Sequence, residues 1–342
     1  IIDATKDALT KLKTRYGPVA GLAELKEELA MQFEGWGPEN ILVSNGAKQG
    51  LYMIFQCLCN PGDEVIIPAP YWVSFTEQVK LAGARPVLVP TDRHQLDPAA
   101  VEAAVTPRTR IILVNSPNNP TGAVYPLESL QAIAHLAARH DLMILSDEAY
   151  SDYVYSGYRH ASVYEVEDVR ERCIITRSFS KSYSMTGFRV GYVAAAQEVI
   201  TALAALPSHL TGTVCTFAQH GALKASTLDQ NALQEWRSDM QRKRDTAFRY
   251  VSSIFECVKP QGAFYLFPDV SDFLQVASHR QPIAGAHRPC ATRTHCPWKF
   301  GDQLPAGGRT RRAPVFRQTG QVVFISSGSD QRRRGASRSD LI

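Results

Sequence analysis

Four short polar segments contain the residues whose types could do chemistry. Each of them follows or ends a run of apolar residues, and they are SNGAKQ (44–49), NSPNNPTG (115–122), SDEAY (146–150) and SFSKSYSMTGFRVG (178–191). Together they offer a lysine, an acid, hydroxyl groups and an arginine. Such a set suits covalent chemistry on a carbonyl group with an anion bound nearby.

Lys181 and Asp147 are the two ionisable candidates. Lys181 lies among small polar residues directly after an apolar run, and a lysine forms a Schiff base only where partial desolvation lowers its pKa. The alternative for this segment taken alone is a solvated surface lysine. Asp147 ends the apolar run MILSD, where a carboxylate needs hydrogen bonds or a cation such as a protonated pyridine nitrogen. The alternative for Asp147 is a cap on a following helix.

The remaining polar residues suit an anion. Arg189, with Ser178 and Ser180, supplies a guanidinium and two hydroxyls that fit a phosphate dianion. In SNGAKQ a glycine turn leads into a helix, whose first amides favour an anion. Asn119 precedes a proline in NPTG, and there the alternative is ordinary turn chemistry.

The elements that must position these residues alternate from Ile41 onward. Longer periodic segments, which predict helices, separate short apolar runs, which predict strands buried on both faces. The predicted strands are 41–45, 63–68, 85–90, 110–115, 142–147, 173–178 and 190–195. This pattern predicts an α/β fold with a mostly parallel central sheet flanked by helices. The four polar segments then lie at the carboxyl ends of strands, where open α/β sheets place their sites.

A long amphipathic segment at 229–255 predicts the helix that joins this sheet domain to a second one. We place a large domain at 1–246 and a smaller one at 247–342. After about residue 271 the periodicity is lost, and residues 275–342 hold 11 Arg, one Lys and three Asp, a net charge of +9. We expect this tail not to form a native small domain, because such a composition buries too little apolar surface.

Composition excludes several classes of function. Residues 1–274 hold 25 basic and 30 acidic groups, and this net charge of −5 argues against a nucleic-acid partner. No run of 18 apolar residues and no signal peptide are present, so we expect a cytoplasmic protein without a membrane span. The seven cysteines are irregularly spaced, which argues against a metal site.

The motifs SPNNPTG, SDEAY and SxSKxxxMxGxRxG, in this order and spacing, resemble the class I and II aminotransferase family of fold type I pyridoxal 5′-phosphate enzymes. Within that family, YGPVAGLAELKEELA, PYWVSF and PQGAFY resemble the bacterial aspartate aminotransferases. The resemblance covers residues 1 to about 271. It implies a pyridoxal phosphate cofactor, a homodimer, and transfer of an amino group from an acidic amino acid, aspartate first, to 2-oxoglutarate.

The resemblance also implies roles for individual residues. Lys181 would hold the cofactor as a Schiff base and move a proton between the substrate Cα and the cofactor C4′. Asp147 would keep the pyridine nitrogen protonated, and Tyr150 and Asn119 would hydrogen-bond O3′. The implied phosphate ligands are Gly46, Ala47, Ser178, Ser180, Arg189 and, from the partner subunit, Tyr16.

The substrate side of the implied site rests on fewer residues. Trp72 would stack on the cofactor ring and, with Asn119, contact the substrate, although an aromatic residue at a strand end is most often core. Lys48 would face the side-chain carboxylate of the substrate. Its alternative is a solvated lysine at a helix start.

Two departures from the family pattern leave other functions open. Family members usually carry several dozen residues before the point where this chain begins. They also have an arginine in an R-[LI]-S-like strand that holds the substrate α-carboxylate, for which Arg309 and Arg317 are weak candidates. The alternatives are a truncated or frameshifted, inactive relic that still binds cofactor, and a C–S lyase of the same fold.

Overall fold

A computed structural model describes residues 1–228 and 230–271 of the chain. The predictions for the tail, including Arg309 and Arg317, lie outside the described residues. Within the described part, no helix is both long enough and apolar enough to cross a membrane.

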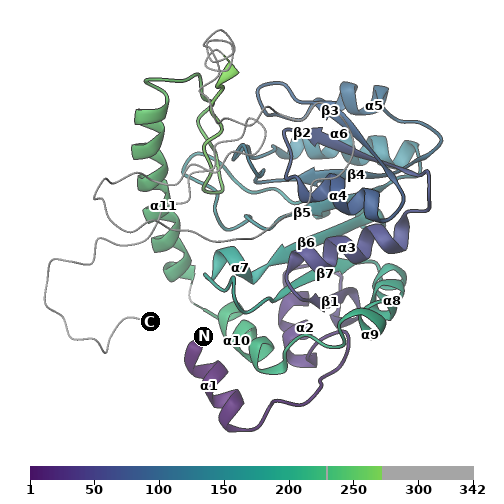
Figure 1. Ribbon diagram of the computed structural model, residues 1–342, viewed down its shortest axis with the longest axis vertical. Coiled ribbons are helices and arrows are strands. Elements are labelled where there is room, and N and C mark those ends of the chain that lie inside the picture. The colour runs from purple at the N-terminus through teal and green to yellow at the C-terminus, as the bar shows by residue number, and fades with distance from the viewer. Residues whose placement is uncertain (229, 272–342) are drawn as a thin grey trace, which may run out of the picture.

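One seven-stranded sheet runs through the centre of the described part (Figure 1), in the order β1-β7-β6-β5-β4-β2-β3. Strand β7 pairs antiparallel with both of its neighbours, and the other pairs are parallel. The strands are β1 (Ile41–Ser44), β2 (Glu64–Ala69), β3 (Arg85–Pro90), β4 (Thr109–Asn115), β5 (Met143–Asp147), β6 (Cys173–Ser178) and β7 (Gly191–Ala195). Each corresponds to a predicted strand, and the prediction of a mostly parallel α/β sheet is confirmed.

Helices cover both faces of the sheet. Apolar side chains of α3, α4 and α8 pack on one face, and those of α2, α5, α6 and α10 pack on the other. The helices are α1 (Ile2–Thr10), α2 (Ala23–Ala30), α3 (Ala47–Leu58), α4 (Ser74–Leu81), α5 (Pro98–Ala103), α6 (Leu127–Arg139), α7 (Phe179–Ser182), α8 (Gln197–Ala205), α9 (Pro207–Leu210), α10 (Thr216–Ser226) and α11 (Gln230–Val251), with short 3-10 turns at Pro38–Asn40, Val163–Glu165 and Glu167–Arg172. Because both faces are covered, the strands are apolar along most of their length rather than alternating.

The long helix predicted at 229–255 is α11, which stands beside the sheet (Figure 1). After it the chain turns back and is tied to the body of the molecule by backbone hydrogen bonds. Gln261 N and Gly262 N donate to Gly122 O at 2.9 and 2.8 Å, and Ala263 N donates to Tyr153 O at 2.8 Å. We call residues 260–265 the return strap; it reaches the carboxyl edge of the sheet from a distant part of the sequence.

Candidate active site

A cavity of about 350 Å³ lies where the ends of β5 and β6 meet the start of α3 and the turn of α7. Of the site residues singled out from the sequence and described by the structure, it brings together all but Gly46 and Tyr16. The predicted residues that line it are Ala47, Lys48, Trp72, Asn119, Asp147, Tyr150, Ser178, Ser180, Lys181 and Arg189. Their assigned roles stay predictions, while their convergence on one cavity is a property of the fold.

Lys181 is presented by the single turn of α7. Ser178 caps this turn, because its hydroxyl accepts a hydrogen bond from Ser180 N at 3.1 Å. The side chain of Lys181 is half-buried, and its Nζ lies 5.7 Å from the centre of the Phe264 ring. Burial lowers the pKa of the Lys181 amine, and the positive charge of Arg189 lowers it further. Lys181 therefore has the environment that a nucleophilic amine requires.

Asp147, the last residue of β5, is 4% exposed. Burial raises the pKa of its carboxyl to about 7, against the lowering effect of hydrogen bonds from Ala149 N at 3.2 Å and Thr176 Oγ1 at 3.3 Å. Both bonds end on Oδ1, and no lysine or arginine among the described residues forms an ion pair with this carboxylate. No helix follows Asp147, so it is not a helix cap. The carboxylate is one that a cationic group in the cavity would stabilise.

Glu148, the next residue, has the opposite environment. It is 1% exposed, and its Oε2 accepts hydrogen bonds from Arg177 Nε at 3.0 Å and Nη2 at 2.8 Å and from His160 Nε2 at 3.2 Å. Although burial acts to raise the pKa of Glu148, the charge of Arg177 lowers it to about 2. Two adjacent buried acids thus differ because only one of them has a cationic partner within the described chain.

One end of the cavity is suited to an anion. Arg189 Nη1 donates to Ser180 Oγ at 3.3 Å, and its Nη2 donates to Asn45 O at 3.2 Å. Gly46 precedes α3 at a φ of +73°, and a Cβ there would lie 2.4 Å from Arg189 Nη2. The turn is therefore packed against the guanidinium, although Gly46 itself is not a cavity-lining residue. The first amides of α3, which no earlier turn can satisfy, add positive potential at this end.

Lys48 and Trp72 lie together at another side of the cavity. Lys48 is exposed, and its Nζ stands 4.7 Å from the centre of the Trp72 ring, which is within cation–π range. Trp72 also packs edge-to-face on Phe75, with ring centres 5.4 Å apart, and contacts the apolar core. Trp72 is therefore both partly core and cavity wall, and the exposed Lys48 lines the cavity with its ammonium over the Trp72 ring.

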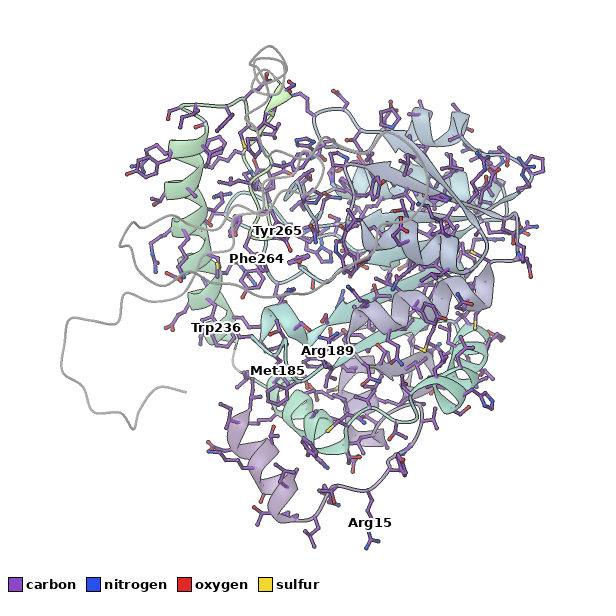
Figure 2. The ribbon with its side chains drawn as sticks, viewed as in Figure 1. Arg15, Met185, Arg189, Trp236, Phe264 and Tyr265 are labelled. Carbon is purple, nitrogen blue, oxygen red and sulfur yellow. The ribbon has the colours of Figure 1, made fainter. Side chains whose placement is uncertain are left out.

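Tyr265 lines the cavity and was not singled out from the sequence. Its hydroxyl is hydrogen-bonded to that of Tyr150, a residue 115 positions earlier, so no local spacing could have revealed the pair. Figure 2 shows Phe264 and Tyr265 between α11 and the sheet. Burial raises the pKa of Tyr150, and the contact with Tyr265 raises it further, so Tyr150 is a neutral hydroxyl. Leu51, Ala149 and Thr186 complete the lining and were not singled out from the sequence either.

Tyr16 lies outside the cavity. It is 91% exposed, in the segment between α1 and α2, and nearby Leu12 is 76% exposed. Tyr16 does not line this chain's own cavity, and its role at the site of a partner subunit stays a prediction.

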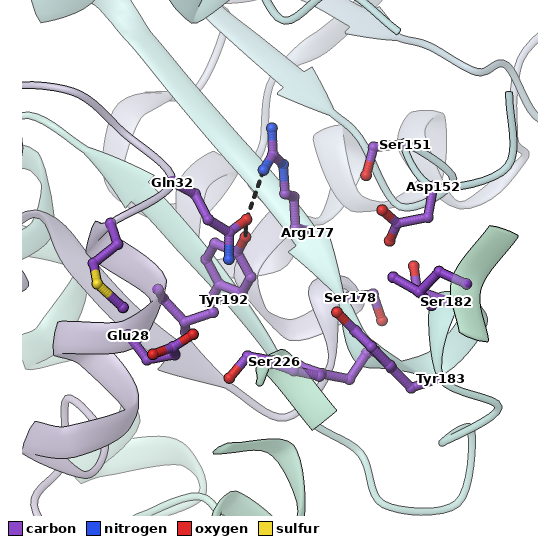
Figure 3. Close-up of a pocket in the computed structure, with 14 residues that line it drawn as sticks. Glu28, Gln32, Ser151, Asp152, Arg177, Ser178, Ser182, Tyr183, Tyr192 and Ser226 are labelled. Atoms are coloured by element: carbon purple, nitrogen blue, oxygen red, sulfur yellow. Dashed lines mark hydrogen bonds between the residues drawn. The ribbon is translucent and has the colours of Figure 1, made fainter. Parts of the chain in front are cut away.

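A second cavity, of about 250 Å³, is lined by Gln32, Arg177, Ser178 and Tyr192 among others (Figure 3). Gln32 Oε1 accepts hydrogen bonds there from Arg177 Nη1 at 2.8 Å and Tyr192 Oη at 3.0 Å. Ser178 lines both cavities, and Phe179 and Ser182 of α7 also line the second one. The polar atoms of Gln32, Arg177 and Tyr192 satisfy one another, which makes this region part of the support behind the Lys181 turn.

Known proteins resemble this chain both in sequence and in structure. The sequence family described as aminotransferase class I and II matches residues 1–281. The chain is 41% identical over 286 residues to the aspartate aminotransferase of Bacillus subtilis, a match that covers 80% of this chain and 73% of that protein.

Solved structures of aminotransferases are also similar to this chain. The structure of aspartate aminotransferase from Thermus thermophilus with maleate matches with a TM-score of 0.74 and 40% identity, covering 79% of this chain and 73% of that one. The aromatic aminotransferase from Pyrococcus horikoshii matches with a TM-score of 0.77 and 36% identity, covering 79% of this chain and 76% of that one. The family match, over residues 1–281, includes all the residues that line the first cavity.

Proposed function

The chain belongs to the class I and II aminotransferases, and from this membership we propose that it binds pyridoxal 5′-phosphate in the cavity around Lys181 and transfers the amino group of an acidic amino acid, aspartate first, to 2-oxoglutarate. The observation that carries the proposal is the meeting of three groups in one cavity: Lys181, Asp147 and Lys48. Each supplies a different requirement, namely a nucleophilic amine, a buried anion and a cation for the substrate.

The residues present fit the cofactor. Asp147 is a buried carboxylate with a raised pKa and no cationic partner in the described chain, and a protonated pyridine nitrogen would supply that partner. Arg189, Ser178 and Ser180, with the first amides of α3, form the end suited to a phosphate. Trp72 offers an aromatic face beside this set. Bound pyridoxal phosphate supplies an electron sink for the pair of electrons left when the substrate Cα loses its proton.

Lys181 is the residue that transfers the proton in this proposal. Burial and the charge of Arg189 lower the pKa of its amine, which favours the neutral form. Nζ would then hold the cofactor through its aldehyde carbon and, once displaced by substrate, would accept the Cα proton. The Phe264 ring, 5.7 Å from Nζ, covers the amine and limits its contact with water. Tyr150 and Asn119 stand beside the same space as neutral hydrogen-bonding groups.

Substrate class rests on Lys48. Its ammonium is held over Trp72, 4.7 Å from the ring centre, where a second carboxylate of the substrate could pair with it. The name of the Thermus thermophilus structure includes maleate, a dicarboxylate, and that relative is an aspartate aminotransferase. The aromatic aminotransferase among the similar structures keeps an aromatic amino acid as the second candidate substrate.

We further propose a homodimer and the two-domain division at about residue 246, inside α11. The side chains of Tyr16 and Leu12, which follow α1, are highly exposed and so are open to contact with a second copy. A same-fold C–S lyase or an inactive cofactor-binding relic would use the same cofactor residues, so only product analysis separates them from the transaminase.

The experiment is a spectrum followed by product analysis. Protein mixed with pyridoxal phosphate should develop a visible absorbance band, and aspartate should then shift this band and yield oxaloacetate. Binding without any change on addition of aspartate or of an aromatic amino acid would favour the relic. Release of ammonia from a sulfur-containing amino acid would favour the lyase.

A further inference from the structure

Tyr265 and Phe264 bring an aromatic group from the end of the described chain onto the reactive part of the cavity. The Tyr150 ring packs edge-to-face on both, with ring centres 5.2 Å from Phe264 and 5.5 Å from Tyr265. The Phe264 ring also lies over Lys181 Nζ. One residue of the strap therefore covers the amine, and the next is hydrogen-bonded to the tyrosine beside it.

The return strap holds these two side chains in place. The strap makes backbone hydrogen bonds to Gly122 and Tyr153. In addition, the side-chain oxygen of Gln261 accepts a hydrogen bond from Val124 N at 2.8 Å. Tyr155 donates its hydroxyl to Ala263 O and its backbone N to Gln261 O. A Cβ at Gly262 would lie 2.6 Å from Tyr153 O, so the strap backbone lies too close to the backbone of Tyr153 for any residue with a side chain.

The two hydroxyls allow two arrangements of one hydrogen bond. Either Tyr150 donates to Tyr265, or Tyr265 donates to Tyr150. Only in the second arrangement is the proton of Tyr150 free to point into the cavity. Because a hydroxyl that accepts a hydrogen bond becomes a better donor, this arrangement also strengthens any bond that Tyr150 makes to a bound acceptor.

We propose that Tyr265 is a positioning residue of this aminotransferase: by donating to Tyr150 it turns the Tyr150 hydroxyl towards an acceptor oxygen of the bound cofactor. The hydroxyls rotate and no proton is transferred. The inference rests on the proposed binding of pyridoxal phosphate at Lys181. It assigns a function to Tyr265, a residue of the strap, whose sequence PQGAFY is part of the family resemblance but had no residue assigned to the site.

The test is the titration of the visible absorbance of the protein loaded with pyridoxal phosphate. Tyr265→Phe keeps the ring and removes only the hydroxyl. The oxygen that accepts from Tyr150 then has a weaker donor and becomes more basic. Loss of one neutral hydrogen bond corresponds to a midpoint about half a unit to one unit higher and to cofactor binding weakened about 3- to 10-fold.

Two further variants distinguish an effect of the Tyr265 hydroxyl on Tyr150 from an effect on the packing of the strap. Tyr155→Phe removes a hydroxyl that holds the same strap through Ala263 O but does not reach Tyr150, so it should leave the midpoint unchanged. In a Tyr150→Phe background the effect of Tyr265→Phe on the midpoint should vanish, because the pair acts as one unit.

The outcomes distinguish the two proposals. A parent protein that gains no visible band on addition of pyridoxal phosphate overturns the proposed function and this inference with it. A parent with a normal band whose midpoint is the same in Tyr265→Phe overturns this inference alone. An equal shift in Tyr155→Phe, or a full shift in the Tyr150→Phe background, also overturns it, because the effect would then come from strap packing.

Discussion

Removing the charge of Asp147 and removing the charge of the adjacent Glu148 should change the stability of the protein in opposite directions. Asp147→Asn keeps the size of the side chain, and the amide oxygen can still accept from Ala149 N and Thr176 Oγ1. Glu148→Gln also keeps its size, but it leaves the Arg177 guanidinium without its counter-ion. In the cofactor-free protein we expect the first variant to be more stable than the parent and the second to be less stable.

The magnitude for Asp147 follows from its pKa. Burial raises the pKa of this carboxyl from 3.8 to about 7 in the folded protein. The folded state therefore binds the proton more tightly than the unfolded state, and stability falls as pH rises from about 4 to about 7. Three units correspond to about 4 kcal/mol. At pH 8 the parent carries the whole of this cost, and Asp147→Asn should recover most of it.

The pH dependence of stability that Glu148 contributes has the opposite sign. Its folded pKa is lowered from 4.5 to about 2, so its contribution is present above about pH 4.5 and is lost as pH falls towards 2. The difference corresponds to about 3 kcal/mol, in line with the cost of breaking a buried ion pair. Glu148→Gln should therefore be less stable than the parent by about this amount at pH 8.

The assay is urea unfolding of the two variants and the parent at pH 8 and pH 5, without cofactor and with excess pyridoxal phosphate. The gain from Asp147→Asn should shrink at pH 5, where the parent carboxyl is largely protonated, and the cofactor should stabilise the parent more than this variant. If Asp147→Asn lost as much stability as Glu148→Gln at pH 8, Asp147 would already be satisfied in the cofactor-free protein. The fit of this residue to a cationic ring would then be wrong.

Three further predictions concern the reaction. Borohydride reduction of protein loaded with pyridoxal phosphate should leave the pyridoxyl group on Lys181 in a peptide map, and a label on another lysine would contradict the assignment. Lys48→Ala should lower kcat/KM for aspartate by about 10- to 100-fold, the equivalent of one charge-assisted bond, and should leave kcat/KM for phenylalanine nearly unchanged. The control is Lys80→Ala, which removes an exposed lysine paired with Glu77 on α4. Equal losses for both substrates would exclude the contact between Lys48 and the substrate carboxylate. Tyr16→Ala and Lys181→Ala should each be impaired alone and regain activity when refolded together, since a mixed dimer holds one intact site; no regain would place Tyr16 outside the partner's site.

The strands were predictable because their signal is local. Runs such as the one ending at Asp147 are apolar on both sides of the chain, and a strand covered by helices on both faces has no other composition available. Short elements with mixed surfaces, such as α1 and α5, carry too few apolar residues to stand out. The cavity could be anticipated from four motifs because parallel strands bring their carboxyl ends to one edge.

The interactions that tune the site were not predictable. Tyr265 reaches Tyr150 through the return strap, and the pairing depends on the path of the chain after α11. The difference between Asp147 and Glu148 depends on Arg177 and His160, which hydrogen-bond Glu148 and, within the described residues, do not bond Asp147. A sequence shows two neighbouring acids, and only the fold shows that one of them has a cationic partner.

The central claim is that this cavity moves an amino group from an acidic amino acid onto the cofactor. The direct measurement is a single half-reaction: protein loaded with pyridoxal phosphate and freed of excess cofactor is mixed with isotopically labelled aspartate and no oxo acid, and the products are quantified by mass spectrometry. We predict labelled oxaloacetate and pyridoxamine 5′-phosphate in equal amounts, one of each per loaded site. Loaded protein that forms neither product from aspartate, or that releases ammonia instead of pyridoxamine phosphate, would contradict the claim.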